Sequence, residues 1–121
     1  MVRGVRGAIT IERDEAQQIW DATAELCLKM VEDNNISPED IASITVSATP
    51  DIHAAFPAKS VRSMDGWQYV PIMCMHEMDV PGALPLCIRV LMHVNTEVAQ
   101  QEIVHVYLKD AVKLRPDLVR K

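Results

Sequence analysis

The chain has 121 residues and a formal net charge of −5, and 49% of its residues are hydrophobic although only 4% are aromatic. This length allows one domain, residues 1–121, with an aliphatic and methionine-rich core, and no apolar run approaches the roughly 20 residues of a membrane span. Three cysteines without a CxxC pair are typical of a reduced, cytoplasmic protein, and the acidic balance argues against nucleic acid as a partner.

The first third of the chain predicts a strand followed by one long helix. Apolar residues and two glycines indicate a strand from Val2 to Ile9. The apolar residues then recur at helical spacing, with Asp14 as the expected N-cap and Asn34-Asn35 as the end of the helix. Residues 12–40 hold nine acidic and two basic residues, a net charge of −7, so the outer face of this helix is expected to be acidic.

Four further elements are predicted along the middle of the chain. A capped turn at residues 37–40 leads into a strand from Ile41 to Ala48. Residues 51–64 are expected to begin as a helical turn whose continuation Pro57 restricts. The next strand, from Tyr69 to Met75, contains Pro71, which cannot donate a backbone hydrogen bond, so this strand belongs at a sheet edge or a bulge.

The last third predicts a long strand over residues 87–95, a short helix over 97–103 capped by Thr96, and a strand over 104–108. Together these elements predict an α/β (α+β) fold, a mixed sheet of about five strands packed with one long helix and short helices. A single helix covers only one face of such a sheet. The uncovered face and edges therefore predict an oligomer.

A permanent cation interrupts the strand CIRVLMHVN. Arg89 shares a strand face with Cys87, Leu91 and His93, whereas the opposite face is aliphatic. An unpaired guanidinium in apolar surroundings is costly, so we expect a protein carboxylate or a ligand to meet it.

Arg6, Glu77 and Tyr107 are the polar residues expected on or beside neighbouring strands. With Arg89 they could form a polar pocket. One interpretation is an internal Arg89–Glu77 salt bridge with Tyr107 as a core tyrosine. The other is an anionic ligand, which two arginines against one glutamate slightly favour.

Other kinds of site are predicted less strongly. A metal site formed by Cys74, His76, Glu77 and His93 would lack any familiar ligand spacing. A Cys74–His nucleophile pair is a further alternative, although strand cysteines in apolar surroundings are more often inert. The chain has neither GxGxxG nor a P-loop, so no nucleotide cofactor is expected.

Several long motifs occur in one order along the chain, namely MVRGVRGA, SATPDIHAAFPAKSVR, GWQYVP, MCMHEMDVPG, CIRV and HVYLKDAVKLRPDL. In this order they resemble the monofunctional AroH-class (Bacillus-type) chorismate mutases over almost the whole chain. The resemblance implies a homotrimer, arranged as a pseudo-α/β-barrel, with its sites between subunits. It also implies isomerisation of chorismate to prephenate for phenylalanine and tyrosine biosynthesis, without a cofactor or a metal.

The resemblance also implies a role for each site residue. Arg6 holds a substrate carboxylate, Arg89 lies beside the ether oxygen, and Glu77 accepts from the ring hydroxyl, with Cys74 at the same end. Tyr107 lies near the side-chain carboxylate. A neighbouring subunit contributes a wall of substrate-binding residues, namely Phe56, Ala58, Lys59 and Arg62. A mobile C-terminal tail over about residues 115–121 closes over the site, with Leu114 and Arg115 as its substrate-binding residues. Met73 also binds substrate, at a position where the family usually has a small polar residue.

The chemistry agrees with this resemblance, because a unimolecular rearrangement of a dianion needs positioned cations and no nucleophile. This chemistry predicts that no protein carboxylate pairs with Arg89, so that the substrate can pair with it. A different class of protein with the same residues would be a non-catalytic trimer that binds or senses a small dicarboxylate.

Overall fold

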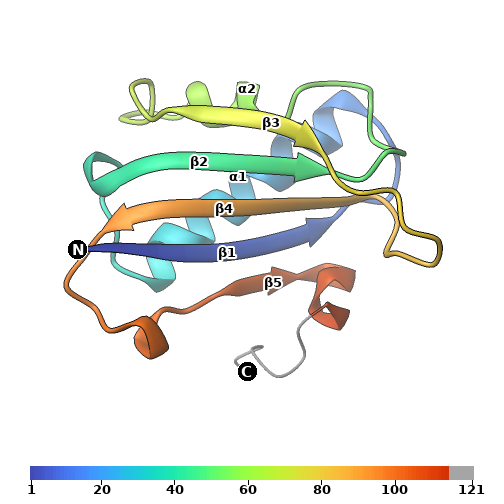
Figure 1. The fold of residues 1–121 in the computed structure, drawn as a ribbon. Helices are drawn as coiled ribbons and strands as arrows, with labels where there is room; N and C mark the ends of the chain where they lie inside the picture. Colours follow the sequence, from blue (N-terminus) through green and yellow to red (C-terminus); the bar gives the residue numbers. More distant parts are fainter. Residues whose placement is uncertain (115–121) are drawn as a thin grey trace.

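The computed structural model describes residues 1–114, which form five strands, one long helix and several short helical turns in a single domain (Figure 1). The strands are β1 (Val2–Thr10), β2 (Ile41–Ala48), β3 (Ile72–His76), β4 (Cys87–Asn95) and β5 (Val106–Leu108). The helices are α1 (Ala16–Asp33) and the short α2 (Ala58–Arg62), and the 3-10 turns are η1 (Pro38–Asp40), η2 (Gln100–Glu102) and η3 (Lys109–Lys113). No helix among these is long and apolar enough to cross a membrane.

The five strands form one mixed sheet, as predicted from the sequence, and the structure shows their order to be β3-β2-β4-β1-β5. The strand β4 lies at the centre and pairs antiparallel with β1 and β2, whereas β5 and β3 are parallel to their neighbours. The expected edge position of the proline-containing strand is confirmed. Pro71 itself precedes β3, and its carbonyl accepts a hydrogen bond from the backbone N–H of Ile44.

The helix α1 packs across one face of the sheet and builds the main core with it (Figure 1). The core side of α1 is formed by Ile19, Ala22, Leu26, Cys27 and Met30. A Cβ atom on Gly7 of β1 would lie 2.5 Å from Met30 Sδ, so only glycine allows the helix this close. Gly7 is therefore the point at which α1 approaches β1 most closely.

The predicted N-cap of α1 is wrong. The cap position is Glu15, without a side-chain cap, and Asp14 instead binds the segment that precedes α2. Asp14 Oδ1 accepts hydrogen bonds from the backbone N–H groups of His53 (3.1 Å) and Ala54 (3.0 Å), and Asp14 Oδ2 lies 3.0 Å from His53 Nδ1. The Asp14 carboxylate, which the local sequence predicted as the helix cap, thus binds a loop that is distant in the sequence.

Two other predicted helical segments differ from the structure. Pro57 does not end a helix but immediately precedes α2, because its fixed φ suits the start of a helix. The helix expected over residues 97–103 is only the turn η2, and Thr96 Oγ1 accepts from the backbone N–H of Val98 in a local turn. The last strand is shorter than predicted because the Asn34 side chain binds both the N–H and the C=O of Val104 at 2.8 Å.

Candidate active site

Polar side chains gather on the face of the sheet opposite α1, here called the open face. Strand pairing places Tyr107 beside Ala8, Ala8 beside Arg89, and Arg89 beside Ser47. Ala8, the smallest side chain of this row, is fully buried. The row therefore brings Tyr107, Arg89 and Ser47 to one face of the sheet.

The pocket on the open face has a volume of about 210 Å³. Its lining includes three charged side chains, a phenol and two hydroxyls: Arg6, Glu77, Arg89, Tyr107, Thr45 and Ser47. The structure therefore brings together the four residues that the sequence singled out. The two hydroxyl residues were missed, although the alternation in IASITVSA places Ser43, Thr45 and Ser47 on one strand face.

Arg89 and Glu77 are in contact, so the prediction that no protein carboxylate pairs with Arg89 is wrong. Arg89 Nη1 lies 3.5 Å from Glu77 Oε1, and Ser47 Oγ donates a hydrogen bond of 2.6 Å to Glu77 Oε2. The Arg89 side chain is 46% exposed, so it is not buried as the apolar strand pattern had suggested. A long ion pair at such exposure contributes little stability, about 0–1 kcal/mol.

The strand β5 and the turn η3 build the other end of the pocket. Tyr107 is buried in a small apolar cluster with Ala8, Cys87 and Ala111, and Leu114 packs against this cluster. Burial raises the pKa of the Cys87 thiol to about 11, against the opposing effect of Arg89, so the thiol is neutral at physiological pH. Leu114 is thus placed near Tyr107, whereas Arg115 and the expected tail over 115–121 lie outside the described residues.

A hydrogen bond from β1 to the residue before β5 fixes the backbone at Arg6. Its N–H donates to His105 Nδ1 at 3.0 Å, just before β5 begins. The acceptor nitrogen carries no proton in this arrangement, so His105 holds the position of Arg6 through one defined tautomer.

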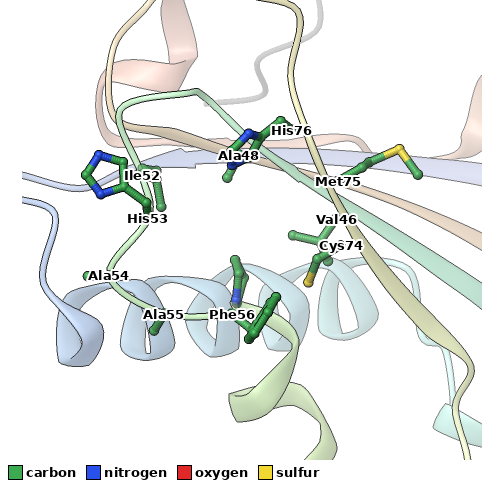
Figure 2. A pocket seen from close by; sticks show the side chains of 11 residues that line it. Val46, Ala48, Ile52, His53, Ala54, Ala55, Phe56, Cys74, Met75 and His76 are labelled. Carbon is green, nitrogen blue, oxygen red and sulfur yellow. The ribbon is translucent and has the colours of Figure 1, made fainter.

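A second, larger pocket of about 620 Å³ lies between the edge strand β3 and the segment before α2 (Figure 2). Cys74 and Phe56 both line it, and Figure 2 shows them on the same side of β3. Cys74 also packs against the main core, whereas Glu77 reaches Ser47 on the open face. Within one chain the structure therefore does not bring Cys74 to the end of the pocket where Glu77 lies.

The predicted wall residues also lie away from the open-face pocket. Phe56 is 78% exposed and Arg62 is exposed, but Ala58 is fully buried in α2. Lys59 Nζ lies 4.4 Å from the centre of the Trp20 ring on α1. Met73, in contrast, is exposed and pairs with Thr45 in the sheet, beside the pocket.

The residues considered as metal ligands lie apart. Cys74 and His76 line the larger pocket, Glu77 binds Ser47, and His93 Nδ1 lies 3.2 Å from Ser43 Oγ. In the part of the chain that the structure describes, no three His, Cys, Asp or Glu side chains are grouped so that they could hold a metal ion.

Comparison with known proteins identifies the family. The family model "Chorismate mutase type I" matches residues 2–118. The chain belongs to the type I chorismate mutase family. A chorismate mutase AroH of Bacillus subtilis is 56% identical over 118 residues, which cover 98% of this chain and 93% of that protein. A chorismate mutase AroH of Thermus thermophilus is 50% identical over 119 residues, covering 98% and 97%.

A solved structure has the same fold. The chorismate mutase from Clostridium thermocellum superposes with a TM-score of 0.87 at 46% identity, covering 89% of this chain and 96% of that chain. This chorismate mutase is therefore an isomerase that acts in aromatic amino acid biosynthesis, as the sequence motifs predicted.

Proposed function

We propose that this chorismate mutase converts chorismate to prephenate in the open-face pocket, with Arg89 stabilising the charge that develops on the ether oxygen. The observation that carries this proposal is the grouping of Arg6, Glu77, Arg89 and Tyr107 around one hollow. Two guanidiniums and one carboxylate leave the pocket with an excess of positive charge. Chorismate, which carries two carboxylates, is an anion of complementary charge.

The reaction requires no group transfer to the protein. Within one molecule, the ether C–O bond breaks and a new C–C bond forms, so no proton, nucleophile or cofactor enters the balance. The protein contributes by holding the compact conformer in which the reacting carbons are close. It also contributes by placing charge where the transition state needs it more than the substrate does.

Arg89 is suited to this second task. As the C–O bond lengthens ahead of C–C bonding, negative charge grows on the ether oxygen, and a fixed guanidinium there acts like an oxyanion hole. The 3.5 Å separation from Glu77 and the half-exposed side chain leave Arg89 with N–H groups available to a ligand. In this proposal Glu77, which accepts a hydrogen bond from Ser47, also accepts one from the ring hydroxyl. Arg6 and Tyr107, which line the same pocket, bind a carboxylate of the substrate.

A neighbouring subunit completes the site in this proposal. The open-face pocket of about 210 Å³ is smaller than the roughly 300 Å³ at which ligand pockets usually begin, and one side of it is open. Exposed Met73 and Leu91 flank it on the open face. In a homotrimer, the segment from Phe56 to Arg62 of one subunit would close the pocket of the next.

The proposal is tested by following the loss of chorismate absorbance with purified protein in the presence of a chelator. We expect turnover that the chelator does not affect. Arg89→Ala should lower kcat by about 10²–10³, as expected for the loss of one oxyanion-type donor. Lysine at this position should restore only part of the activity, because its point charge cannot reproduce the planar fork.

Three outcomes would contradict the proposal. Binding of chorismate without turnover would indicate a non-catalytic dicarboxylate-binding protein. Turnover abolished by the chelator would indicate a metal-dependent reaction. Near wild-type kcat in the Arg89→Ala variant would refute the electrostatic role of this side chain.

A further inference from the structure

Trp20 on α1 makes two contacts with the segment from Phe56 to Arg62, one just before α2 and one within it. Its indole Nε1 donates a hydrogen bond of 3.2 Å to the backbone carbonyl of Phe56, and its ring lies under the ammonium group of Lys59 at 4.4 Å. The first contact fixes the backbone where the exposed Phe56 side chain begins. The second restrains a long, flexible cationic side chain over an aromatic face.

We propose that Trp20 is a positioning residue for the substrate-binding wall that each subunit contributes to its neighbour. This inference rests on the proposed function, in which Phe56, Lys59 and Arg62 form that wall. Trp20 touches no substrate in this arrangement. It acts through Phe56 and Lys59, which it holds at a set distance from the helix layer.

Ala58 and Val61 anchor the inner side of the wall segment in the protein interior, whereas its first residue and its outer side need other support. The helix α2 has only five residues, and a helix of this length is not stable by itself. Phe56 is 78% exposed, so the main core does not hold its side chain. Asp14 binds the backbone N–H groups of His53 and Ala54 just before the segment, and Trp20 binds the Phe56 carbonyl at its first residue.

The larger pocket separates this wall from β3, which explains why support comes from α1 instead. Phe56 lines the pocket together with Cys74, whereas Lys59 lies on the opposite side of the segment, in a groove with Trp20 and Asp21. One face of the segment is therefore open toward a neighbour, and the other is anchored on the helix. A substitution on α1 of one subunit should then change substrate binding in the pocket of the neighbouring subunit.

Two substitutions remove first one and then both contacts of Trp20. Trp20→Phe keeps a ring under Lys59 but removes the N–H donor, and Trp20→Leu removes both while keeping an apolar helix former. We expect Trp20→Phe to raise the KM for chorismate about fivefold, the usual effect of one lost hydrogen bond. Trp20→Leu should raise it at least about tenfold, because the cation–π contact is lost as well. In both variants kcat should stay within about twofold, because Arg89 is unchanged.

The matched control is Leu28→Ala, an exposed apolar side chain two turns further along α1, which should leave KM unchanged. A merely structural role of Trp20 would lower the melting temperature of the variants without changing the KM of the folded enzyme. Trp20→Leu with wild-type KM would overturn the inference while wild-type turnover and the Arg89→Ala effect still support the proposed function. Absent wild-type turnover would refute the proposed function itself.

Mixed trimers provide a second test, which remains valid if Trp20→Leu lowers stability. At chorismate concentrations below KM, refolding Trp20→Leu with Arg89→Ala should regain about a quarter of wild-type activity, because half the walls and half the cation sets are intact. Refolding Trp20→Leu with the combined Phe56→Ala and Arg62→Ala variant should give no gain over the two parents. The reverse pattern would place Trp20 with the cation set and overturn the inference.

Discussion

At the residue scale, the open-face pocket is defined by an imbalance of charge. Arg6 and Arg89 place two cations beside the single carboxylate of Glu77. A dianionic substrate reverses that balance, and Lys59 and Arg62 of the proposed wall would restore it. The contact of 3.5 Å between Arg89 and Glu77 is compatible with this exchange, because an exposed ion pair is weak enough for a ligand to displace.

Glu77 allows charge and shape to be tested separately. Glu77→Gln keeps the shape and one accepting oxygen but removes the negative charge, whereas Glu77→Ala removes both. If Glu77 accepts from the ring hydroxyl, we expect Gln to retain more activity than Ala, with both variants melting within a few degrees of the wild type. The measurements are kcat/KM and thermal unfolding.

A severe loss of thermal stability in Glu77→Ala would instead mean that the Arg89–Glu77 pair is structural. The control is Ser47→Ala, which removes the donor to Glu77 Oε2 but leaves the carboxylate charged. It should reduce activity less than Glu77→Ala.

At the element scale, the packing of α1 on β1 determines where Arg6 lies. Gly7 follows Arg6 and faces the helix, where a methyl group would lie 2.5 Å from Met30 Sδ and 3.0 Å from Leu26 Cδ1. Both neighbours are fully buried in the core, so a shift of either side chain would disturb the packing around it. A methyl group at this position must therefore repack these side chains and push β1 away from the helix.

Gly7→Ala should lower the free energy of unfolding by about 1–3 kcal/mol, the usual cost of overpacking a core. It should also raise the KM for chorismate, because displacement of β1 moves Arg6 on the opposite face. Thermal unfolding and steady-state kinetics measure the two effects. Gly4→Ala is the matched control, because its new methyl group would make an ordinary 3.5 Å contact with Leu91. Equal effects of the two substitutions would contradict this account of β1.

Strands were the elements that sequence reasoning predicted best, because alternation in β1, β2 and β4 reflects a sheet with one buried face. The same alternation placed Arg89 and Tyr107 correctly. Elements governed by distant partners were predicted worst. Asp14 binds His53 and Ala54, 39 and 40 residues away, and Asn34 binds Val104, 70 residues away.

The contact between Arg89 and Glu77 could not be decided from sequence for a similar reason. The strand pattern gives the face on which each side chain lies, but Glu77 follows β3, beyond the last residue of the strand. Its direction depends on the hydrogen bond from Ser47 and on the backbone hydrogen bond from Glu77 N–H to the Ala48 carbonyl. Each arises only when the strands are paired.

At the scale of the whole molecule, the two halves of the proposed site lie on different sides of β3. The cation set faces the open side of the sheet, whereas Phe56 borders the larger pocket on the α1 side. A single chain cannot close its own pocket with its own wall. Three chains arranged by a closed rotation can, because each heterologous interface then joins one cation set to one wall.

We therefore expect a homotrimer with one site at each interface, and sedimentation should give the mass of three chains. Arg89→Ala and the combined Phe56→Ala and Arg62→Ala variant should each be inactive alone. When they are unfolded and refolded together in equal amounts, about a quarter of the interfaces should join an intact cation set to an intact wall. Recovered activity should follow that fraction. Refolding each variant alone is the control for incomplete recovery of the native state. Mixed trimers that remain as inactive as their parents would mean that all the key residues act within one chain, and an active monomer would exclude the shared site altogether.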